Sequence, residues 1–250
     1  MFVVRRDAET HDTEGGWFRA RWHFSFDDYY DPAWTQFGSL RVFNDDRLIP
    51  GAIWPLHPHR DVEGLTYVVE GVFRHADDLD RDEELPLLPA GSVQRMTLGS
   101  GAWHSEQNGS QTEPMRFIQI WILPGESGLP PSVEQRVFTR ADRTNRLLRV
   151  ISGTGDHAVL VHQDAAVYVS RLEPGASATH ELDPGRGCYL YVIEGDLAIG
   201  DASLATGDAV KVAEEPSISL EASAPTEPIM VEVRVGDEPW PGVKREPALP

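Results

Sequence analysis

Two short stretches of the chain carry residue types and spacings that suit a metal site. His57 and His59 stand two positions apart ahead of an apolar run, and His104 and Glu106 repeat that spacing. In an extended chain the side chains of residues i and i+2 point to the same face, so each pair can aim at one point. Three imidazoles and one carboxylate suit a divalent transition metal that keeps a position open for substrate or oxygen.

The residue types leave three points open. Imidazole and carboxylate ligands suit Fe, Ni, Mn, Co, Cu and Zn, so they do not select the metal. Glu106 could accept a hydrogen bond from a ligand histidine instead of binding the metal. Glu63, four positions after His59, could orient a histidine, face the substrate or serve only the fold.

The segments around these residues are predicted to be strands. Residues 17–26 alternate apolar and polar side chains, apolar runs follow at 65–69 and 115–123, and a Pro/Gly turn leads into a further strand at 92–97. Asn44 to Arg47 is predicted to be a turn, because Asn and Asp favour turns. No segment shows a long 3.6-residue apolar period, and at most one short helix is expected within residues 133–145. The expected class is all-β.

The second half of the chain repeats the first in outline. Tyr189–Gly195 (YLYVIEG) resembles Leu65–Gly71 (LTYVVEG), and residues 204–208 resemble residues 88–92. A repeat of about 120 residues built from short strands and Gly/Pro turns predicts two β-barrels of one kind. We place the boundary in the loop at 124–131, which gives domains of residues 1–125 and 126–250.

The repeat also predicts that only the N-terminal barrel binds a metal. Aligning the two halves on their glycines places other residues opposite the candidate ligands: Glu181 and Asp183 in the first motif, and Leu220 and Ala222 in the second. His180 falls one residue out of register, which in a strand is the opposite face. The second half therefore keeps the scaffold and lacks the ligand set.

The composition narrows the class of partner and compartment. The 250 residues carry a net charge of −18, which argues against binding to a nucleic-acid backbone and favours a basic protein surface as any protein partner. One cysteine, Cys188, excludes an intramolecular disulfide and fits a reducing compartment. No apolar stretch is long enough to span a membrane, so a cytoplasmic protein is expected.

The other histidines and the tryptophans have simpler interpretations. The remaining six histidines are expected to be packed or at the surface: His11, His23, His75, His157, His162 and His180. Cys188 is expected to be an inert buried thiol. Core or pocket-wall positions, suited to a flat aromatic ligand, are expected for Trp54, Trp103 and Trp121.

The two motifs resemble those of the cupin superfamily and, within it, the pirin family. HPHRDVEGLTYVVEG at 57–71 is similar to the first cupin motif, and MTLGSGAWHSEQN at 96–108 is similar to the second. The His-Pro-His triplet, the His-x-Glu pair and the M-T-x-G-x-G run are features of the pirin variant. The resemblance is strong over about residues 38–125 and rests mainly on the repeat after residue 150.

This resemblance implies a bicupin, in which two antiparallel barrels are stacked and the N-terminal barrel holds iron or a similar divalent metal. The implied ligands are His57, His59, His104 and Glu106. Some pirins resemble quercetin 2,3-dioxygenases, which open a flavonol ring with O₂, and others resemble regulators that bind protein partners. For an enzyme, the general base would be Glu106, or Glu63 if it faces the cavity.

The sequence is therefore compatible with three functions. The first is a metal-dependent dioxygenase, with Fe(II) as the expected metal and a small aromatic substrate. The second is a metal- or redox-responsive regulator, although no docking motif stands out beyond the acidic segment 77–84. The third is a metal-dependent isomerase or hydrolase on the same barrel, which would consume no O₂. A compact monomer or a weak oligomer is compatible with each.

Overall fold

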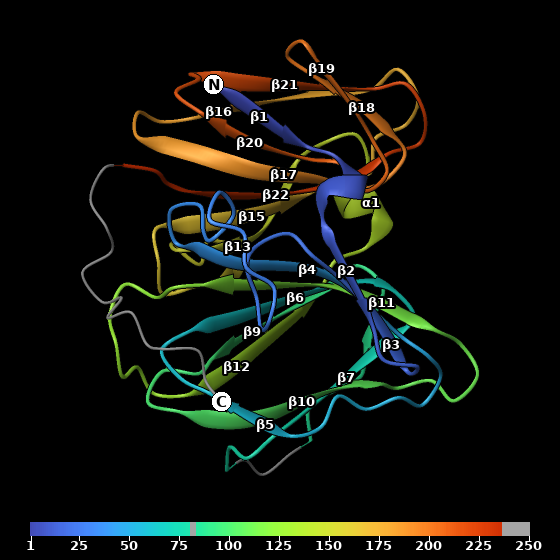
Figure 1. The fold of residues 1–250 in the computed structure, drawn as a ribbon, viewed down its shortest axis with the longest axis vertical. Helices are drawn as coiled ribbons and strands as arrows, with labels where there is room; N and C mark the ends of the chain where they lie inside the picture. The colour runs from blue at the N-terminus through green and yellow to red at the C-terminus, as the bar shows by residue number, and fades with distance from the viewer. Residues whose placement is uncertain (81–83, 237–250) are drawn as a thin grey trace.

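The computed structural model describes residues 1–80 and 84–236 and shows two similar β-sandwiches stacked on each other (Figure 1). Four sheets build them, two with seven strands and two with four. In the described part of the chain the helices are one turn each, a 3-10 helix at Asp7–Glu9 and α1 at Arg140–Arg143. No helix within it is long and apolar enough to cross a membrane. The all-β prediction is confirmed.

The N-terminal sandwich contains the candidate ligands. Its larger sheet has, in spatial order, β12 (Ser132–Val137), β9 (Ser92–Thr97), β6 (Glu63–Glu70), β11 (Met115–Ile122), β4 (Leu40–Leu48), β3 (Phe18–Trp22) and β2 (His11–Glu14). Its smaller sheet has β5 (His57–His59), β10 (Ala102–Asn108), β7 (Val72–Asp77) and β8 (Leu88–Pro89).

The C-terminal sandwich repeats this arrangement. Its larger sheet has β1 (Phe2–Arg5), β20 (Ala209–Ala213), β17 (Arg186–Glu194), β22 (Glu227–Arg234), β15 (Ala165–Val169), β13 (Leu148–Ser152) and β14 (Val159–Leu160). Its smaller sheet has β16 (Ser177–Glu181), β21 (Ser217–Ala222), β18 (Asp196–Ile199) and β19 (Ala202–Ala205). In each half the two sheets face each other as a sandwich and do not close into a barrel. The expected bicupin architecture is confirmed, and the expected barrels are open sandwiches.

Two glycine pairs confirm the register of the repeat. Gly71 and Gly195 follow β6 and β17 with φ of +79° and +97°, and Gly91 and Gly207 precede β9 and β20 with φ of +89° and +90°. A Cβ at Gly71 would collide with the Pro114 carbonyl, and one at Gly195 with the equivalent Pro225 carbonyl. Only glycine adopts these backbone angles without strain, so the same turn recurs in both halves.

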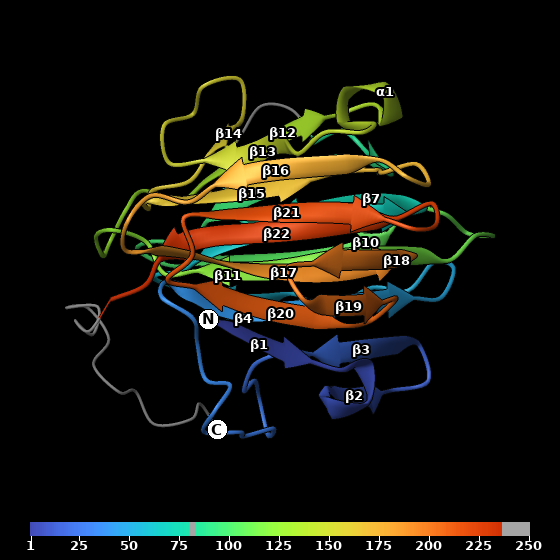
Figure 2. The same ribbon diagram turned by 90° about the horizontal axis from the view of Figure 1, so that it is seen from above.

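The halves exchange an edge strand. β12 follows the loop at 124–131 yet pairs with β9, and β1 at the start of the chain pairs with β20. In Figure 1 the blue β1 accordingly lies among the orange and red strands of the upper half, and the view from above shows it beside β20 (Figure 2). The division into domains at residue 125 stays a prediction; the pairing of strands crosses it at both ends.

The main hydrophobic core lies between the two seven-stranded sheets. Leu65, Tyr67 and Ile120 of the N-terminal sheet pack there with Tyr189 and Val231 of the C-terminal sheet, in one cluster of buried side chains. The interior of the C-terminal sandwich is filled by a separate apolar cluster that includes Leu220 and Ala222. These two residues stand where the repeat places the second ligand pair, so apolar packing occupies that position in the C-terminal half.

Some local expectations were wrong. Residues 44–47 form no turn; they continue β4, and Asn44, Asp45 and Asp46 are buried. By contrast, the one short helix expected within residues 133–145 is present as α1, in a segment that also contains most of β12. The strand expected over residues 17–26 is shorter, since β3 ends at Trp22. Of the acidic segment 77–84, residues 81–83 lie outside the described residues.

Candidate metal centre

Two neighbouring strands of the small N-terminal sheet bring the candidate ligands together. β5 pairs antiparallel with β10, which places His57 directly opposite His104 and His59 opposite Ala102. The ring nitrogens offered by His57, His59 and His104 all lie within 4.8 Å of one another. Their ring centroids are 4.5 to 5.2 Å apart. This cluster could hold one metal ion.

The hydrogen bonding of two of these histidines fits that use. His57 Nδ1 lies 2.7 Å from the Pro55 carbonyl oxygen, so Nδ1 donates and Nε2 is left to bind a metal. His104 Nε2 is buried and has no hydrogen-bond partner within the described residues. A buried ring nitrogen without a partner costs free energy, and a bound metal would satisfy it.

The electrostatics keep the cluster in the ligating form. Burial, together with a smaller contribution from the neighbouring histidines, lowers the pKa of His59 to about 4 and that of His104 to about 2. Burial also lowers the pKa of His57. All three imidazoles are therefore neutral at pH 7, which is the state that binds metals.

Glu106 lies beside the cluster, and its carboxylate oxygens are not among the possible metal-binding atoms that lie within 4.8 Å of one another. Its Oε1 is 3.3 Å from His104 Nδ1 and accepts a hydrogen bond of 3.5 Å from Gln119 Nε2. Thr66 Oγ1 in turn donates to Gln119 Oε1 over 3.2 Å. Burial raises the pKa of Glu106 to about 7. The carboxyl is held either to orient His104 or to become a fourth ligand.

A third pair with the same i, i+2 spacing was missed by the sequence reasoning. His75 and Asp77 on β7 lie directly opposite Glu106 and His104 in the register of β10. The His75 ring centroid is 5.8 Å from that of His104, and His75 Nε2 lies 2.9 Å from Asp77 Oδ2. The repeated i, i+2 spacing of His75 and Asp77 could have been noticed in the sequence. The sequence does not show that β7 pairs with β10, and this pairing is what brings His75 and Asp77 beside the cluster.

Glu63 does not face this centre. On β6 it shares a face with Leu65 and Tyr67, which pack into the core between the halves. It is fully buried, and His162 Nδ1 lies 2.9 Å from its Oε1, with Arg95 Nε 3.9 Å from Oε2. Glu63 was expected to act as a general base only if its side chain faced the cavity, and it does not. Its contact with His162 instead links the N-terminal half to the C-terminal half.

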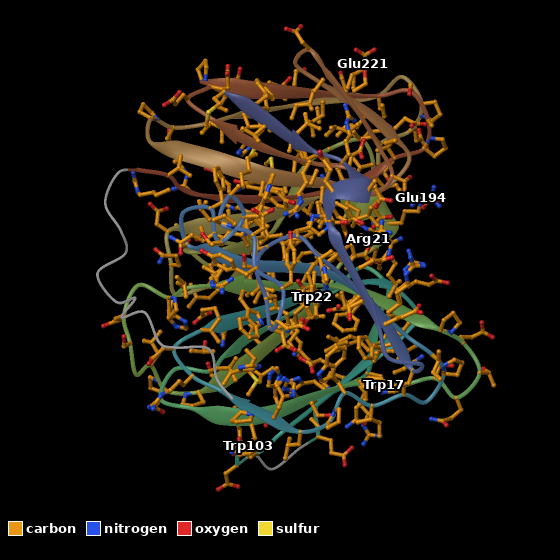
Figure 3. The ribbon with its side chains drawn as sticks, viewed as in Figure 1. Trp17, Arg21, Trp22, Trp103, Glu194 and Glu221 are labelled. Carbon is orange, nitrogen blue, oxygen red and sulfur yellow. The ribbon has the colours of Figure 1, made fainter. Side chains whose placement is uncertain are left out.

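The cluster opens into a cavity of about 740 Å³ between the two sheets of the N-terminal sandwich. Its wall is rich in aromatic side chains, and His57, His59 and Glu106 contribute to it. Trp54 and Trp121 line it as expected, and the Trp121 ring packs edge-on against His59 with 4.5 Å between ring centroids. The prediction that Trp103 lies in the core or the pocket wall was wrong, since its side chain is 45% exposed at the lower rim of the molecule (Figure 3).

Other residues at a distance from the cluster are packed as expected. Cys188 is fully buried, and burial raises the pKa of its thiol to about 12. His23 is also fully buried, and its Nδ1 lies 2.7 Å from the Tyr189 hydroxyl oxygen. His180 Nε2 lies 2.7 Å from Glu232 Oε2 in the C-terminal half. These groups contribute to the fold.

Comparisons with known proteins agree with this arrangement. Residues 3–122 match the family model "Pirin", and residues 149–233 match "Quercetinase C-terminal cupin domain". A Zymomonas mobilis protein, provisionally named a quercetin 2,3-dioxygenase, is 40% identical over 92% of this chain and 97% of its own. The Escherichia coli K12 protein named quercetin 2,3-dioxygenase is 35% identical over 93% and 99%, respectively.

A solved structure extends the comparison to the fold. The crystal structure of the bacterial pirin YhhW from Escherichia coli, in complex with nickel(II), is 34% identical and superposes with a TM-score of 0.87 over 94% of this chain and all of that one. Together with the histidine cluster, this similarity indicates a divalent metal. With the two cupin-like sandwiches and the close relatives over nearly the whole length, the chain belongs to the pirin family of the cupin superfamily.

Proposed function

We propose that this protein is a metal-dependent dioxygenase that opens the ring of a flavonol such as quercetin with O₂. The observation that carries the proposal is the three-histidine cluster at the wall of a cavity of about 740 Å³ lined by aromatic side chains. The names of the relatives from Zymomonas mobilis and Escherichia coli support the same reaction class.

Each histidine has a definite part in this proposal. His57, His59 and His104 would hold the metal, for which we propose Fe(II), with Ni, Mn, Co, Cu or Zn as alternatives. A bound metal would supply Lewis acidity toward a substrate oxygen and the redox chemistry of O₂. The Pro55 carbonyl and Glu106 orient the rings of His57 and His104 from outside.

Glu106 is the proposed general base. It is buried at the cavity wall, and its raised pKa of about 7 suits a group that takes a proton near neutral pH. Gln119, held by Thr66, donates to one carboxylate oxygen and so sets the orientation of the other. If Glu106 binds the metal instead, it must leave it to accept the proton.

The cavity supports a flat aromatic substrate. Its volume lies within the roughly 300–1,000 Å³ that is usual for small-molecule sites. Trp54, Trp121 and Phe117 contribute flat apolar surfaces to its wall. Apolar walls of this kind exclude water and favour stacking against a planar ring system.

Oxygen uptake on quercetin tests the proposal. Protein reconstituted anaerobically with each of the six metals is compared with metal-stripped protein and with the His59→Ala variant. We expect uptake with a loaded metal and none in the other two samples. The absence of uptake from folded, metal-loaded protein would refute a quercetinase; turnover of another substrate without O₂ would instead support an isomerase or hydrolase.

One observation favours a second function, that of a regulator that binds a protein partner. Trp103 is 45% exposed on β10, one residue before the ligand His104 and opposite Pro58 between the other two ligands. A change at the metal could therefore alter an apolar surface. Redox-dependent capture of a basic partner, lost in Trp103→Ala and without turnover, would support the regulator. We further expect a cytoplasmic monomer or weak oligomer.

A further inference from the structure

One strand brings two polar side chains into the aromatic cavity on the wall that faces the histidines. Along β4, Asn44 and Asp46 line the cavity, whereas Phe43 and Asp45 point to the opposite face, toward the core between the halves. β4 belongs to the seven-stranded sheet and the histidines belong to the four-stranded sheet. The two sets of polar groups therefore lie on opposite walls.

Asp45, on the same strand, is a buried carboxylate whose hydrogen bonds are all supplied by the protein. Its two oxygens accept hydrogen bonds of 2.9 and 2.5 Å from Arg116, and the Tyr191 hydroxyl donates another of 2.6 Å. The neighbouring Asp46 has no such partners. Its Oδ1 and the Oδ1 of Asn44 are both buried without a hydrogen-bond partner among the described residues, and the two residues are only 6% and 3% exposed.

The surroundings of these two side chains define what could satisfy them. In the register of the sheet, Asn44 lies between Trp22 and Gln119, and Asp46 lies between Ala20 and Phe117. None of these register neighbours is cationic, and Arg41, which also lines the cavity, donates to the Ser25 and Thr35 carbonyls. A buried acceptor without a partner costs free energy, which a hydrogen-bond donor from a ligand would offset. A neutral ligand group with an O–H donor fits here, and a ligand anion does not.

We propose that Asn44 and Asp46 form a hydroxyl-binding subsite, which selects planar aromatic ligands that carry a phenolic hydroxyl on the edge turned away from the metal cluster. This inference rests on the proposed function in one respect, namely that the cavity takes a flavonol-like ligand. A carboxylate accepts from a hydroxyl, and a neutral carboxyl can both accept and donate. The subsite therefore does not depend on the protonation of Asp46.

Ligand binding to the metal-free protein tests the subsite separately from catalysis. The tryptophans in the cavity wall allow binding to be followed by quenching of their fluorescence. The probes are quercetin and 3-hydroxyflavone, which keeps the same ring system and the metal-facing hydroxyl but lacks the outer hydroxyls. The variants are Asp46→Leu and Asn44→Leu, with Asp46→Asn as the matched control that retains an acceptor of nearly the same shape.

We expect the wild-type protein to bind quercetin about 10-fold more tightly than 3-hydroxyflavone, a difference of the size that one or two hydrogen bonds provide. Asp46→Leu and Asn44→Leu should each weaken quercetin binding by about 3- to 10-fold and leave 3-hydroxyflavone unchanged. Asp46→Asn should keep most of the preference. An equal loss for both ligands, or an unchanged preference in both Leu variants, would overturn the subsite.

Thermal stability provides a readout that a merely structural role would not give. Replacing a buried carboxyl that lacks a partner by an apolar side chain of similar shape removes a desolvation cost, so Asp46→Leu should melt at or above the wild-type temperature. A lower melting temperature with unchanged ligand preference would assign Asp46 to the fold. If the Leu variants lose the preference for quercetin over 3-hydroxyflavone but the wild-type protein takes up no oxygen, the subsite stands and the dioxygenase proposal fails. If the wild-type protein takes up oxygen but the Leu variants keep the preference, the dioxygenase proposal stands and the subsite fails.

Discussion

The role of Glu106 can be decided by counting the protons that leave the protein when a metal binds. In the metal-free protein, burial raises the pKa of Glu106 from 4.5 to about 7. A metal that takes Glu106 as a ligand must displace its proton, because a carboxylate binds only when ionised. If Glu106 only accepts a hydrogen bond from His104, it can do so as a neutral carboxyl and keep its proton, and the Glu106→Gln amide oxygen can replace it as the acceptor.

The pKa values set the expected number. With a pKa of about 7, Glu106 is protonated to about 0.9 at pH 6, about 0.5 at pH 7 and about 0.1 at pH 8, and metal binding should release these amounts if Glu106 is a ligand. His59 and His104 add almost nothing above pH 6, because their pKa values of about 4 and about 2 leave them neutral. Proton release should thus fall steeply between pH 6 and pH 8.

Isothermal titration calorimetry with Ni(II), in buffers of different ionisation enthalpy, measures this release. If Glu106 is a ligand, Glu106→Gln should abolish this release. It should weaken nickel binding strongly if Glu106 is a ligand and by less than about 10-fold if it only orients His104. Asp46→Asn is the matched control, since burial and two neighbouring acids also raise the pKa of Asp46 well above its usual range. A release below about 0.2 protons at pH 6 would refute binding of the metal by Glu106.

The same shift predicts the pH dependence of stability. Because the folded-state pKa of Glu106 lies above its unfolded value, the folded state binds more protons between about pH 4.5 and pH 7. The metal-free protein therefore loses stability as the pH rises through this window. Glu106→Gln should recover up to about 3 kcal/mol in denaturant unfolding at pH 8. A variant less stable than the wild type at pH 8 would contradict the assigned burial cost.

Three further predictions concern the centre and the fold. His104→Ala should lower nickel affinity by more than about 100-fold while the far-ultraviolet circular dichroism stays unchanged; an affinity within 10-fold would remove His104 from the ligands. Glu63→Leu should destabilise the protein by about 1–3 kcal/mol in urea, because it removes the buried carboxylate that pairs with His162 while Arg95 keeps Glu134 and Ser132 as partners, and should leave nickel affinity within about threefold. Gly71→Ala should cost more stability than Gly175→Ala: both glycines have positive φ, and only a Cβ at Gly71 meets another backbone group.

Much of the candidate centre could be predicted from the sequence, because a strand places residues i and i+2 on one face. That rule applied to His57 and His59, and to His104 and Glu106, without knowledge of the fold. The repeat was also readable, since the turns at Gly71 and Gly195 need a backbone conformation that few other residues adopt. The absence of ligands from the second motif of the C-terminal half followed from Leu220 and Ala222.

Long-range pairing decided what the sequence left open. Asn44, Asp45 and Asp46 have the composition of a turn, yet they continue β4 because Asp45 gains Arg116 and Tyr191 as partners from distant strands. The segment therefore became a strand, and its alternation turned Asp46 into the cavity.

Glu63 shows the same limit. It stands in the first motif, four residues after a candidate ligand, and its position along the chain left open whether it faces the cavity or serves the fold. The alternation of β6 instead turns it toward His162, which is 99 residues away in the sequence. A local pattern determines which residues share a face of a strand, whereas only the packing of one sheet against another determines whether that face looks into a cavity or into a core.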